Sequence, residues 1–301
     1  MRILRLLGVM RNKKVPSPAI SQYHFLPRKY GWDLLLDIGR IETLENFVLD
    51  STPHQLSFYE ILFLEKGNGH FMLDEHKVAL TPGTIIFTSP GQVRRWYAKR
   101  PVSGYALFFD KDFLNLFFTD ELFLYRFQYF HQYANPASMK VPAAAFRQAE
   151  DLLKDMEQEF VALRNDSSHL IRAVLCQLLV TLNRWYADVY QLQGDTYVHP
   201  DFFRFRSLLE QKFRTHHHVA DYIIMLRMSP AQLNKICRQY GGLSAQKMIH
   251  HKLLSEIKKA LRGRETVSEI AYSFNFSDPS NFNRFFKQLA GTTPRQFRDA
   301  L

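Results

Sequence analysis

Hydrogen-bonding and cationic side chains are spaced along residues 279–288 as they would be on one face of a helix. Ser280, Asn283, Arg284 and Lys287 follow one another at intervals of three, one and three residues, and residues three or four apart are neighbours on a helix surface. An Asn amide can pair with the N6/N7 edge of adenine, whereas Arg and Lys mostly contact phosphates. The spacing predicts a helix that reads duplex DNA. The alternative is an ordinary helical hairpin with a solvated polar face.

The same segment carries a start signal and an apolar side. Asp278 can cap the helix with its carboxylate, and Pro279 suits the first helical position, where a backbone N–H is not needed. The buried side is predicted to consist of Phe282, Phe285, Phe286 and Leu289. Aromatic anchors behind a polar face are suited to a helix that enters the major groove.

A shorter helix is predicted immediately before it. Thr266 and Glu269 form a T-x-x-E capping box, so this helix should start at Val267. Its apolar stripe at i, i+3, i+4 and i+7 consists of Val267, Ile270, Ala271 and Phe274. Asn275 follows, and Asn tolerates the left-handed backbone conformation that ends many helices. The two helices together predict a helix-turn-helix unit.

The pattern occurs twice, because Ser229-Pro230 matches Asp278-Pro279 at an offset of 49 residues. At that offset the following pairs match: Leu233 and Phe282, Asn234 and Asn283, Lys235 and Arg284, Ile236 and Phe285, Cys237 and Phe286, Arg238 and Lys287, Gln239 and Gln288, Gly242 and Gly291, Ser244 and Thr293. The helical stretch from Ser244 to Arg262 spans roughly 28 Å at ~1.5 Å per residue. With its turns, it should hold the two reader helices about 34 Å apart, one turn of B-DNA.

Position along the two reader helices assigns the contacts. Base edges are predicted to meet Ala231, Gln232, Asn234, Pro279, Ser280 and Asn283, with the Pro279 ring touching a thymine methyl. Phosphates are predicted to meet Lys235, Arg238, Asn281, Arg284 and Lys287.

Charge is concentrated in the same part of the chain. The protein has 301 residues and a net charge of +10, and from Pro200 onward 17 Lys and Arg face 8 Asp and Glu. A basic module joined to a near-neutral one indicates double-stranded DNA as the partner of the module. The length allows two domains, and a hydrophobic content of 46% excludes a disordered chain.

The remaining composition predicts a cytoplasmic protein. Cys176 and Cys237 lie on apolar helix faces and are interpreted as reduced core thiols. Residues 1–20 are interrupted by Arg5 and Arg11, lack a clean hydrophobic region for a signal peptide, and are predicted to be disordered. No run approaches the length of a membrane span, so no membrane partner is expected.

Residues 200–301 resemble the paired helix-turn-helix domain of the AraC family of bacterial transcription regulators. The resemblance is carried by Ile270-Ala271, Asn275 to Asp278, Phe282, Arg284 to Lys287, Gly291, Thr293-Pro294 and Phe297-Arg298. The family usually has Gly where Asn275 stands and an aromatic where Cys237 stands, and Leu253 and Ile257 replace its usual Arg and Ala. The resemblance implies a sequence-specific DNA-binding regulator, with RNA polymerase as a further partner and a homodimer as the assembly.

Short strands separated by turns are predicted between Tyr23 and Phe109. Leu56 to Leu64 is apolar on both faces, as in a covered strand. Lys66-Gly67-Asn68-Gly69 predicts a hairpin turn, and Gln92 to Tyr97 and Gly104 to Phe109 are predicted as separate strands. Strands at this even spacing favour a small antiparallel barrel or jelly roll.

This half resembles the cupin-like sensor domain of AraC-family regulators, and the resemblance implies a small-molecule effector. It is carried by Phe58 to Ile61, Gly67-x-Gly69, Pro82 to Thr84, Pro90 to Val93, Gly104-Tyr105 and Phe108 to Asp110. The predicted fold class is therefore α+β, an N-terminal antiparallel β-barrel with packed helices followed by an all-α double helix-turn-helix domain. The predicted domains are 21–140 for the sensor, 141–193 for a helical dimerisation or linker region, and 200–301.

The barrel residues disfavour metal chemistry and favour a metal-free pocket. Enzymatic cupins hold a metal with a His-x-His pair, which this half lacks, and Arg94 stands where a His is common in such sensor domains. No metal or other cofactor is expected. An effector pocket of His54, Glu60, Arg94, Trp96 and Tyr105 can hold an anionic or sugar-like molecule by charge-assisted bonds and stacking. Alternatively, an arginine of this strand is solvent-facing or salt-bridged.

Two alternatives to the regulator hypothesis follow from the same residues. One is a metal-free cupin-type enzyme with a nucleic-acid-binding appendage, for which Glu60 and His54 are the candidate acid–base pair. The other is an effector-independent DNA-binding protein whose barrel only dimerises. The apolar stripe of a predicted helix is wider than packing on one partner requires; it consists of Leu170, Val174, Leu178, Leu182 and Trp185. The resemblance implies that this region forms a helical dimer interface, and the rival interpretation is burial against the chain's own barrel. The aromatic-rich segment from Asp112 to Tyr133 is expected to pack on the barrel, and His216 to His218 to form a polar helix terminus.

Overall fold

The computed structural model describes residues 21–25, 34–44, 52–115, 123–130, 135–162, 164–192 and 199–299. The predicted disorder of residues 1–20 and the predicted linker at 193–196 lie outside these ranges. The chain divides into two compact units, and among the described residues the first comprises 21–192 and the second 199–299. No helix within the described ranges is long and apolar enough to cross a membrane.

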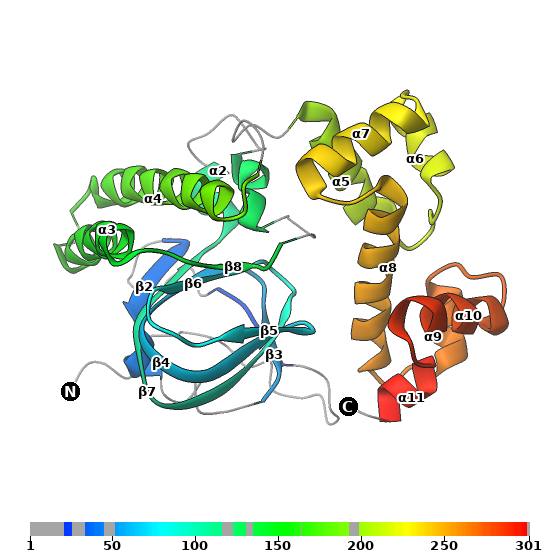
Figure 1. The fold of residues 1–301 in the computed structure, drawn as a ribbon, viewed down its shortest axis with the longest axis horizontal. Coiled ribbons are helices and arrows are strands. Elements are labelled where there is room, and N and C mark those ends of the chain that lie inside the picture. Colours follow the sequence, from blue (N-terminus) through cyan, green and yellow to red (C-terminus); the bar gives the residue numbers. More distant parts are fainter. Residues whose placement is uncertain are drawn as a thin grey trace. The chain divides into compact units, whose positions relative to one another are not determined.

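The first unit is built on one curled, eight-stranded sheet (Figure 1). Its strands are β1 (Ser21–Tyr23), β2 (Leu36–Arg40), β3 (His54–Leu56), β4 (Tyr59–Leu73), β5 (His76–Ala79), β6 (Thr84–Thr88), β7 (Val93–Phe109) and β8 (Ser138–Lys140). The order is β1-β3-β7-β4-β6-β8, and β2 and β5 pair with β7 and β4. All pairs are antiparallel except β1 with β3, which is parallel.

Two long strands replace the four short ones that the sequence predicted. The expected turn at Lys66–Gly69 is wrong, because β4 runs through it and stays paired with β7 on both sides of two register shifts. Gly69 and Gly104 have φ values of 103° and 149°. A Cβ at Gly104 would lie 1.8 Å from the Phe63 carbonyl oxygen, so glycine allows the strands to bend while they cross closely. The reversal comes instead at Asp74, whose φ is 52°.

The sheet has a buried core on each face. The side chains of alternate residues of β4 belong to different cores. Tyr59, Ile61 and Phe63 face the helices, whereas Leu62 and Leu64 face the barrel interior. The prediction that 56–64 is covered on both faces is therefore confirmed for β4. The interior core also contains Phe58, Phe71, Trp96 and Phe108.

Helices cover the outer face of the sheet (Figure 1). They are the short α2 (Lys111–Asn115), η2 (Phe123–Arg126) and η3 (Gln128–Phe130), followed by the long α3 (Ala143–Ala162) and α4 (Ser167–Val189). The short η1 (Ile41–Leu44) instead contributes Ile41 to the interior core. The described aromatics Phe113, Phe127 and Tyr129 are buried in this core, which confirms their expected packing on the barrel. On α4, Leu178 and Leu182 are buried against the chain's own core, while Leu170 of the same predicted stripe is 53% exposed.

The second unit is entirely helical among its described residues. Its helices are α5 (Pro200–Lys212), α6 (Val219–Leu226), α7 (Pro230–Gly241), α8 (Ala245–Leu261), α9 (Val267–Ser273), α10 (Pro279–Ala290) and α11 (Pro294–Asp299). Within this unit α8 runs between two groups of helices, α5 to α7 at one end and α9 to α11 at the other (Figure 1). The helix pairs α6–α7 and α9–α10 are the two units that the sequence predicted.

Candidate nucleic-acid interface

The second reader helix, α10, is fixed at its start by Asp278. One oxygen of this carboxylate accepts hydrogen bonds from the backbone N–H groups of Ser280 and Asn281, at 2.7 and 2.9 Å. Pro279 occupies the first helical position, and the helix ends at Gly291, whose φ is 77°. The preceding turn contains Asn275 with φ 57°, so the predicted left-handed turn residue is confirmed.

The cap at Asp278 predicts a pH-dependent stability. The pKa of this carboxyl is lowered, chiefly because the backbone N–H of Asn281 donates to it. The unfolded chain, with an ordinary pKa of about 3.9, therefore binds the proton more readily. The stabilisation is present above that value and is lost as the pH falls through the lower folded pKa.

Thermal unfolding between about pH 6 and pH 2 should therefore show a Tm difference between wild type and Asp278→Ala that shrinks as the solution becomes acidic. Asp278→Asn is the matched control, since Asn caps helices well but does not titrate in this range. A Tm difference that stays constant down to the lowest pH would contradict this role of the carboxylate.

One side of α10 is buried and the other is exposed. Phe282 and Phe286 are fully buried in a core with residues of α8 and α9, namely Leu253, Ile257, Leu261, Ile270, Ala271 and Phe274. The predicted buried position of Leu289 is wrong, because this side chain is 37% exposed near the helix end. The exposed side carries Ser280, Asn283, Arg284 and Lys287.

Asn281, predicted as a phosphate contact, belongs to a hydrogen-bond network at the start of α10. Its Nδ2 donates to Ser277 Oγ at 2.7 Å and to the second carboxylate oxygen of Asp278 at 2.6 Å. Its Oδ1 accepts a hydrogen bond from Arg284 Nη2. The network holds the Arg284 guanidinium beside the helix N-terminus, which itself favours anions.

The first reader helix, α7, begins with a capping box at Ser229 and Gln232. Ser229 Oγ accepts from the Gln232 N–H at 3.2 Å, and Gln232 Oε1 accepts from the Ser229 N–H at 2.9 Å. Leu233 and Cys237 are fully buried. Burial raises the pKa of the Cys237 thiol to about 12, so the sulfur serves as a core group. The exposed side carries Ala231, Gln232, Lys235 and Arg238.

Asn234 and Asn283 occupy equivalent positions in the two copies of the repeat, but they differ in burial and in hydrogen bonding. Asn234 is half-buried; its Oδ1 accepts from the Ala245 N–H and its Nδ2 donates to the Pro230 carbonyl, both at 3.0 Å. Asn283 is exposed, and among the described residues its side chain makes no hydrogen bond. The left-handed residue of the first turn is Arg227, with φ 55°, and no local sequence signal predicts this conformation for an arginine.

Contacts along α8 connect the two helix-turn-helix units. Lys252 lies between Glu210 at 2.6 Å and Glu256 at 3.1 Å, which joins α8 to α5. At the other end, Arg298 of α11 donates to the carbonyls of Leu261 and Glu265 at 2.9 and 2.7 Å. These bonds satisfy carbonyls at the C-terminal end of α8 and after it, where no helical partner exists.

The histidine run 216–218 lies just before α6 and at its start. The His218 N–H donates to the Asp221 carboxylate at 3.1 Å, as in a capping box, so the predicted polar helix terminus is confirmed. The His217 ring packs on Phe276 with 5.0 Å between centroids, and burial lowers its pKa. The described residues contain no group of three or more His, Cys, Asp or Glu side chains placed to hold a metal ion.

In the first unit, four of the five predicted pocket residues share the interior face of the barrel. Glu60 and Arg94 form an ion pair there and are only 5% and 3% exposed, and Thr88 Oγ1 donates to the same carboxylate at 3.2 Å. His54 pairs in register with Arg94, and Trp96 packs edge-on against Phe71 in the interior core. Burial raises the pKa of Glu60 and lowers that of Arg94, while their mutual attraction opposes both shifts.

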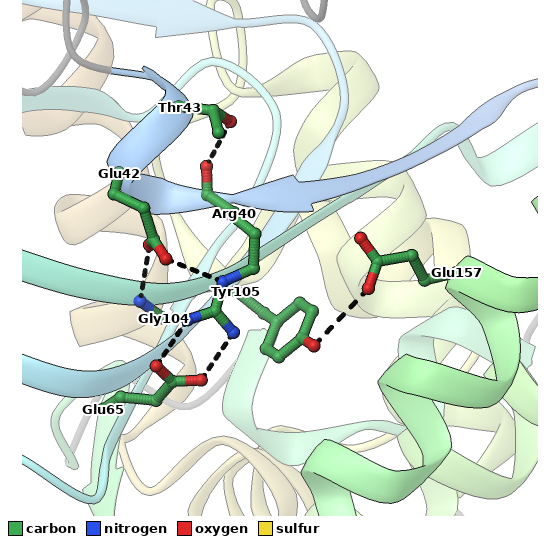
Figure 2. A network of polar contacts seen from close by, with 7 residues as sticks. All are labelled: Arg40, Glu42, Thr43, Glu65, Gly104, Tyr105 and Glu157. Atoms are coloured by element: carbon green, nitrogen blue, oxygen red, sulfur yellow. Dashed lines mark hydrogen bonds and ion pairs between the residues drawn. The ribbon is translucent and has the colours of Figure 1, made fainter. Parts of the chain in front are cut away.

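Tyr105, the fifth predicted pocket residue, is not brought together with the others. Figure 2 shows it on the helix-facing side of the sheet, where its hydroxyl lies 3.5 Å from Glu157 of α3. The Arg40 guanidinium lies 4.3 Å from the Tyr105 ring centroid and donates two hydrogen bonds to Glu65, at 2.6 and 2.5 Å. Glu42 accepts from the Gly104 N–H at 3.1 Å, so this network fastens β2 to β4 and β7 (Figure 2).

A sequence model of the AraC-like ligand binding domain matches residues 46–178, and a model of the helix-turn-helix domain matches residues 224–300. The chain belongs to the AraC family of transcription regulators. This AraC-family protein is a DNA-binding transcription regulator that joins a ligand-binding domain to a helix-turn-helix domain.

Curated AraC-family relatives align over most of the chain. The HTH-type transcriptional activator RhaR of Mannheimia succiniciproducens is 22% identical over 255 residues, covering 81% of this chain and 86% of that protein. RhaR of Yersinia pestis bv. Antiqua (strain Angola) is 24% identical and covers 81% and 83%. Among solved structures, ToxT from Vibrio cholerae O395 is 12% identical with a TM-score of 0.38, covering 81% of this chain and 89% of that one.

Proposed function

We propose that this protein controls transcription by placing α7 and α10 in successive major grooves on one face of the duplex. The observation that carries the proposal is the repeat itself: two capped helices, each buried on one side and polar on the other, are joined through α8. The 17 residues of α8 extend ~26 Å at ~1.5 Å per residue. With the turns at either end, this length suits a separation of about 34 Å, one helical turn of DNA.

The exposed side chains of the readers divide by chemistry. On α10, Asn283 and Ser280 have hydrogen-bonding groups for base edges, and the Pro279 ring is suited to a thymine methyl. On α7, Ala231 is the corresponding methyl contact, and Gln232 lies beside it. The cations Lys235, Arg238, Arg284 and Lys287, together with Asn281, are assigned to phosphates. All of these residues except Asn281 and Pro279, which are half-buried, are exposed in the structure.

The proposal is tested with Asn283→Ala and, as a matched control on the same helix, Lys287→Ala. Asn283→Ala should cost ~1–3 kcal/mol at one base position and relax the preference there, because the adenine-pairing amide is lost. Lys287→Ala should weaken binding to all sequences about equally and flatten the salt dependence by roughly one unit. Binding of each variant to single-base operator variants, at several salt concentrations, measures both effects. An unchanged base preference in Asn283→Ala would refute the assignment.

The ligand-binding domain is proposed to take a small effector in the interior of the barrel. His54, Glu60, Arg94 and Trp96 line the same interior face and offer two charges, an imidazole and an aromatic ring. Tyr105 is left out of this group because it faces α3. Since Glu60 and Arg94 already neutralise one another's charge, a polar effector that separates them must provide equivalent partners for both.

The assembly and the direction of control are also proposals. The names of the RhaR relatives identify transcriptional activators, and we infer an activating role with RNA polymerase as a partner. A cytoplasmic homodimer is inferred from α4, on which Leu170 and Val189 are 53% and 44% exposed beside half-buried Val174 and Trp185. An exposed apolar side chain at each end of one helix face is compatible with contact to a second copy.

A further inference from the structure

The first reader helix uses its central amide inside the protein. Ala245 is the first residue of α8, and a backbone N–H at that position has no partner within its own helix. Asn234 Oδ1 accepts this N–H at 3.0 Å, while Asn234 Nδ2 donates to the Pro230 carbonyl at 3.0 Å. Both hydrogen-bonding ends of the amide are thereby engaged. The side chain connects the middle of α7 to the start of α8.

The second copy of the repeat lacks the group that would engage its amide. At the same offset of 49 residues, Asn234 corresponds to Asn283 and Ala245 corresponds to Pro294. Proline has no backbone N–H, so Asn283 has no donor at the start of α11. The two caps are otherwise alike, since Ser244 accepts from the Lys247 N–H at 3.4 Å and Thr293 from the Gln296 N–H at 3.2 Å. The single difference between alanine and proline accounts for the exposed Asn283.

Gln232, the amide near the start of the first reader helix, already has hydrogen-bonding partners within the protein. Its Oε1 accepts from both the N–H and the hydroxyl of Ser229, at 2.9 and 3.1 Å. An amide that pairs with adenine must accept from N6 and donate to N7 at the same time. With its oxygen held in the capping box, Gln232 cannot make this pair without giving up the cap. The other exposed side chains of α7 are Pro230, Ala231, Lys235, Arg238 and Gln239. Gln239 lies near the C-terminal end of α7, whereas the N-terminal residues of a recognition helix are those that contact base edges.

We propose that the two readers divide their roles, with Asn234 a positioning residue that fastens α7 to α8 and Asn283 the specificity-determining amide. This inference rests on the proposed DNA-binding function. The half-site beneath α10 is read through a bidentate amide contact. The half-site beneath α7 is held by phosphate contacts and the Ala231 methyl, so its sequence is discriminated less. The sequence repeat alone would instead assign the two asparagines the same role.

The test uses the full-length protein and a pool of duplexes randomised over both half-sites. Asn283→Ala should reduce the preference at one base position about 5- to 150-fold. Asn234→Ala should leave every base preference unchanged, lower the affinity for all sequences by one common factor, and lower the Tm by about 4–8 °C. Asn234→Asp keeps the acceptor for Ala245 but loses the donor to the Pro230 carbonyl. It should therefore lower the Tm while leaving the base preferences unchanged, although its charge weakens binding overall.

Substituting Pro294 provides the reciprocal experiment. Pro294→Ala introduces an N–H where Asn283 can accept it, and should reduce the preference in the second half-site as Asn283→Ala does. The proposal is overturned if Asn234→Ala or Asn234→Asp changes the base preference in the first half-site, or if Pro294→Ala leaves the second unchanged. A wild-type protein that selects no sequence at all would refute the proposed function itself, which is a separate result.

Discussion

Replacing Phe286 with alanine should lower the free energy of unfolding of the C-terminal domain by about 3–5 kcal/mol, the usual cost of removing a buried phenylalanine. Phe286 is fully buried, and its ring lies 5.6 Å from that of Phe297 and 6.3 Å from that of Phe282, measured between centroids. It therefore joins α10 to α11. Domains of this size are stable by only about 5–15 kcal/mol, so the loss removes much of the stability that holds α10 in place.

Chemical denaturation of wild type and Phe286→Ala measures this loss, and binding to the operator measures its effect on function. Lys287→Ala is the matched control, because it changes the next residue of the same helix on the exposed side and should leave the unfolding midpoint nearly unchanged. Cys237→Ala, at the same position of the first repeat, removes only a sulfur atom and should cost less than Phe286→Ala. A Phe286→Ala protein with wild-type stability would contradict the buried packing of α10.

Replacing Arg94 with alanine should destabilise the N-terminal domain by about 3–5 kcal/mol, because Glu60 would be left as an uncompensated charge in the barrel interior. The pair is almost completely buried, and the Thr88 hydroxyl is a neutral hydrogen-bonding neighbour of both side chains. Removing both charges at once has a different outcome. The double variant Glu60→Leu, Arg94→Met fills the space with apolar atoms and should be close to wild type or more stable.

Urea unfolding of the two variants separates these cases. The exposed pair Lys154–Asp151, with side chains 52% and 73% exposed, provides the control, and Lys154→Ala should change stability little. The double variant also tests the proposed effector site, since it should fold yet lose its response to a polar ligand. A single Arg94→Ala variant as stable as the double variant would show that the buried charge on Glu60 costs nothing, contrary to the prediction.

Local signals were predictable from the sequence because their chemistry is contained within a few residues. The capping box of Thr266 and Glu269 is present, with bonds of 3.2 and 2.7 Å, and so is the Asp278 cap. The left-handed Asn275 follows from the tolerance of its side chain for that conformation. The duplicated helix-turn-helix pattern was visible because the repeat preserves the alternation of buried and exposed positions.

Contacts between distant segments were not predictable from local patterns. The sequence predicts Gly104 to Phe109 as a separate strand, and a separate strand does not fix which face of the sheet Tyr105 occupies. In the continuous strand β7, Trp96, Ala106 and Phe108 face the interior, so Tyr105 must face outward. Likewise, the role of Asn234 depends on where α8 begins, eleven residues further along the chain. The length of a strand and the packing of one helix on another depend on contacts with distant segments, so the sequence of one segment alone does not determine them.

The uninterrupted course of β7 has a mechanical consequence for signalling. Arg94, near the first residue of β7, points into the barrel, and Tyr105, near the last, points outward to α3. The pairing of β7 with β4 extends from Arg94 to Phe109, with two register shifts between Lys99 and Gly104, so the same neighbouring strand holds both ends. Any molecule that draws Arg94 away from Glu60 therefore pulls on β7, the same strand that contacts α3 through Tyr105.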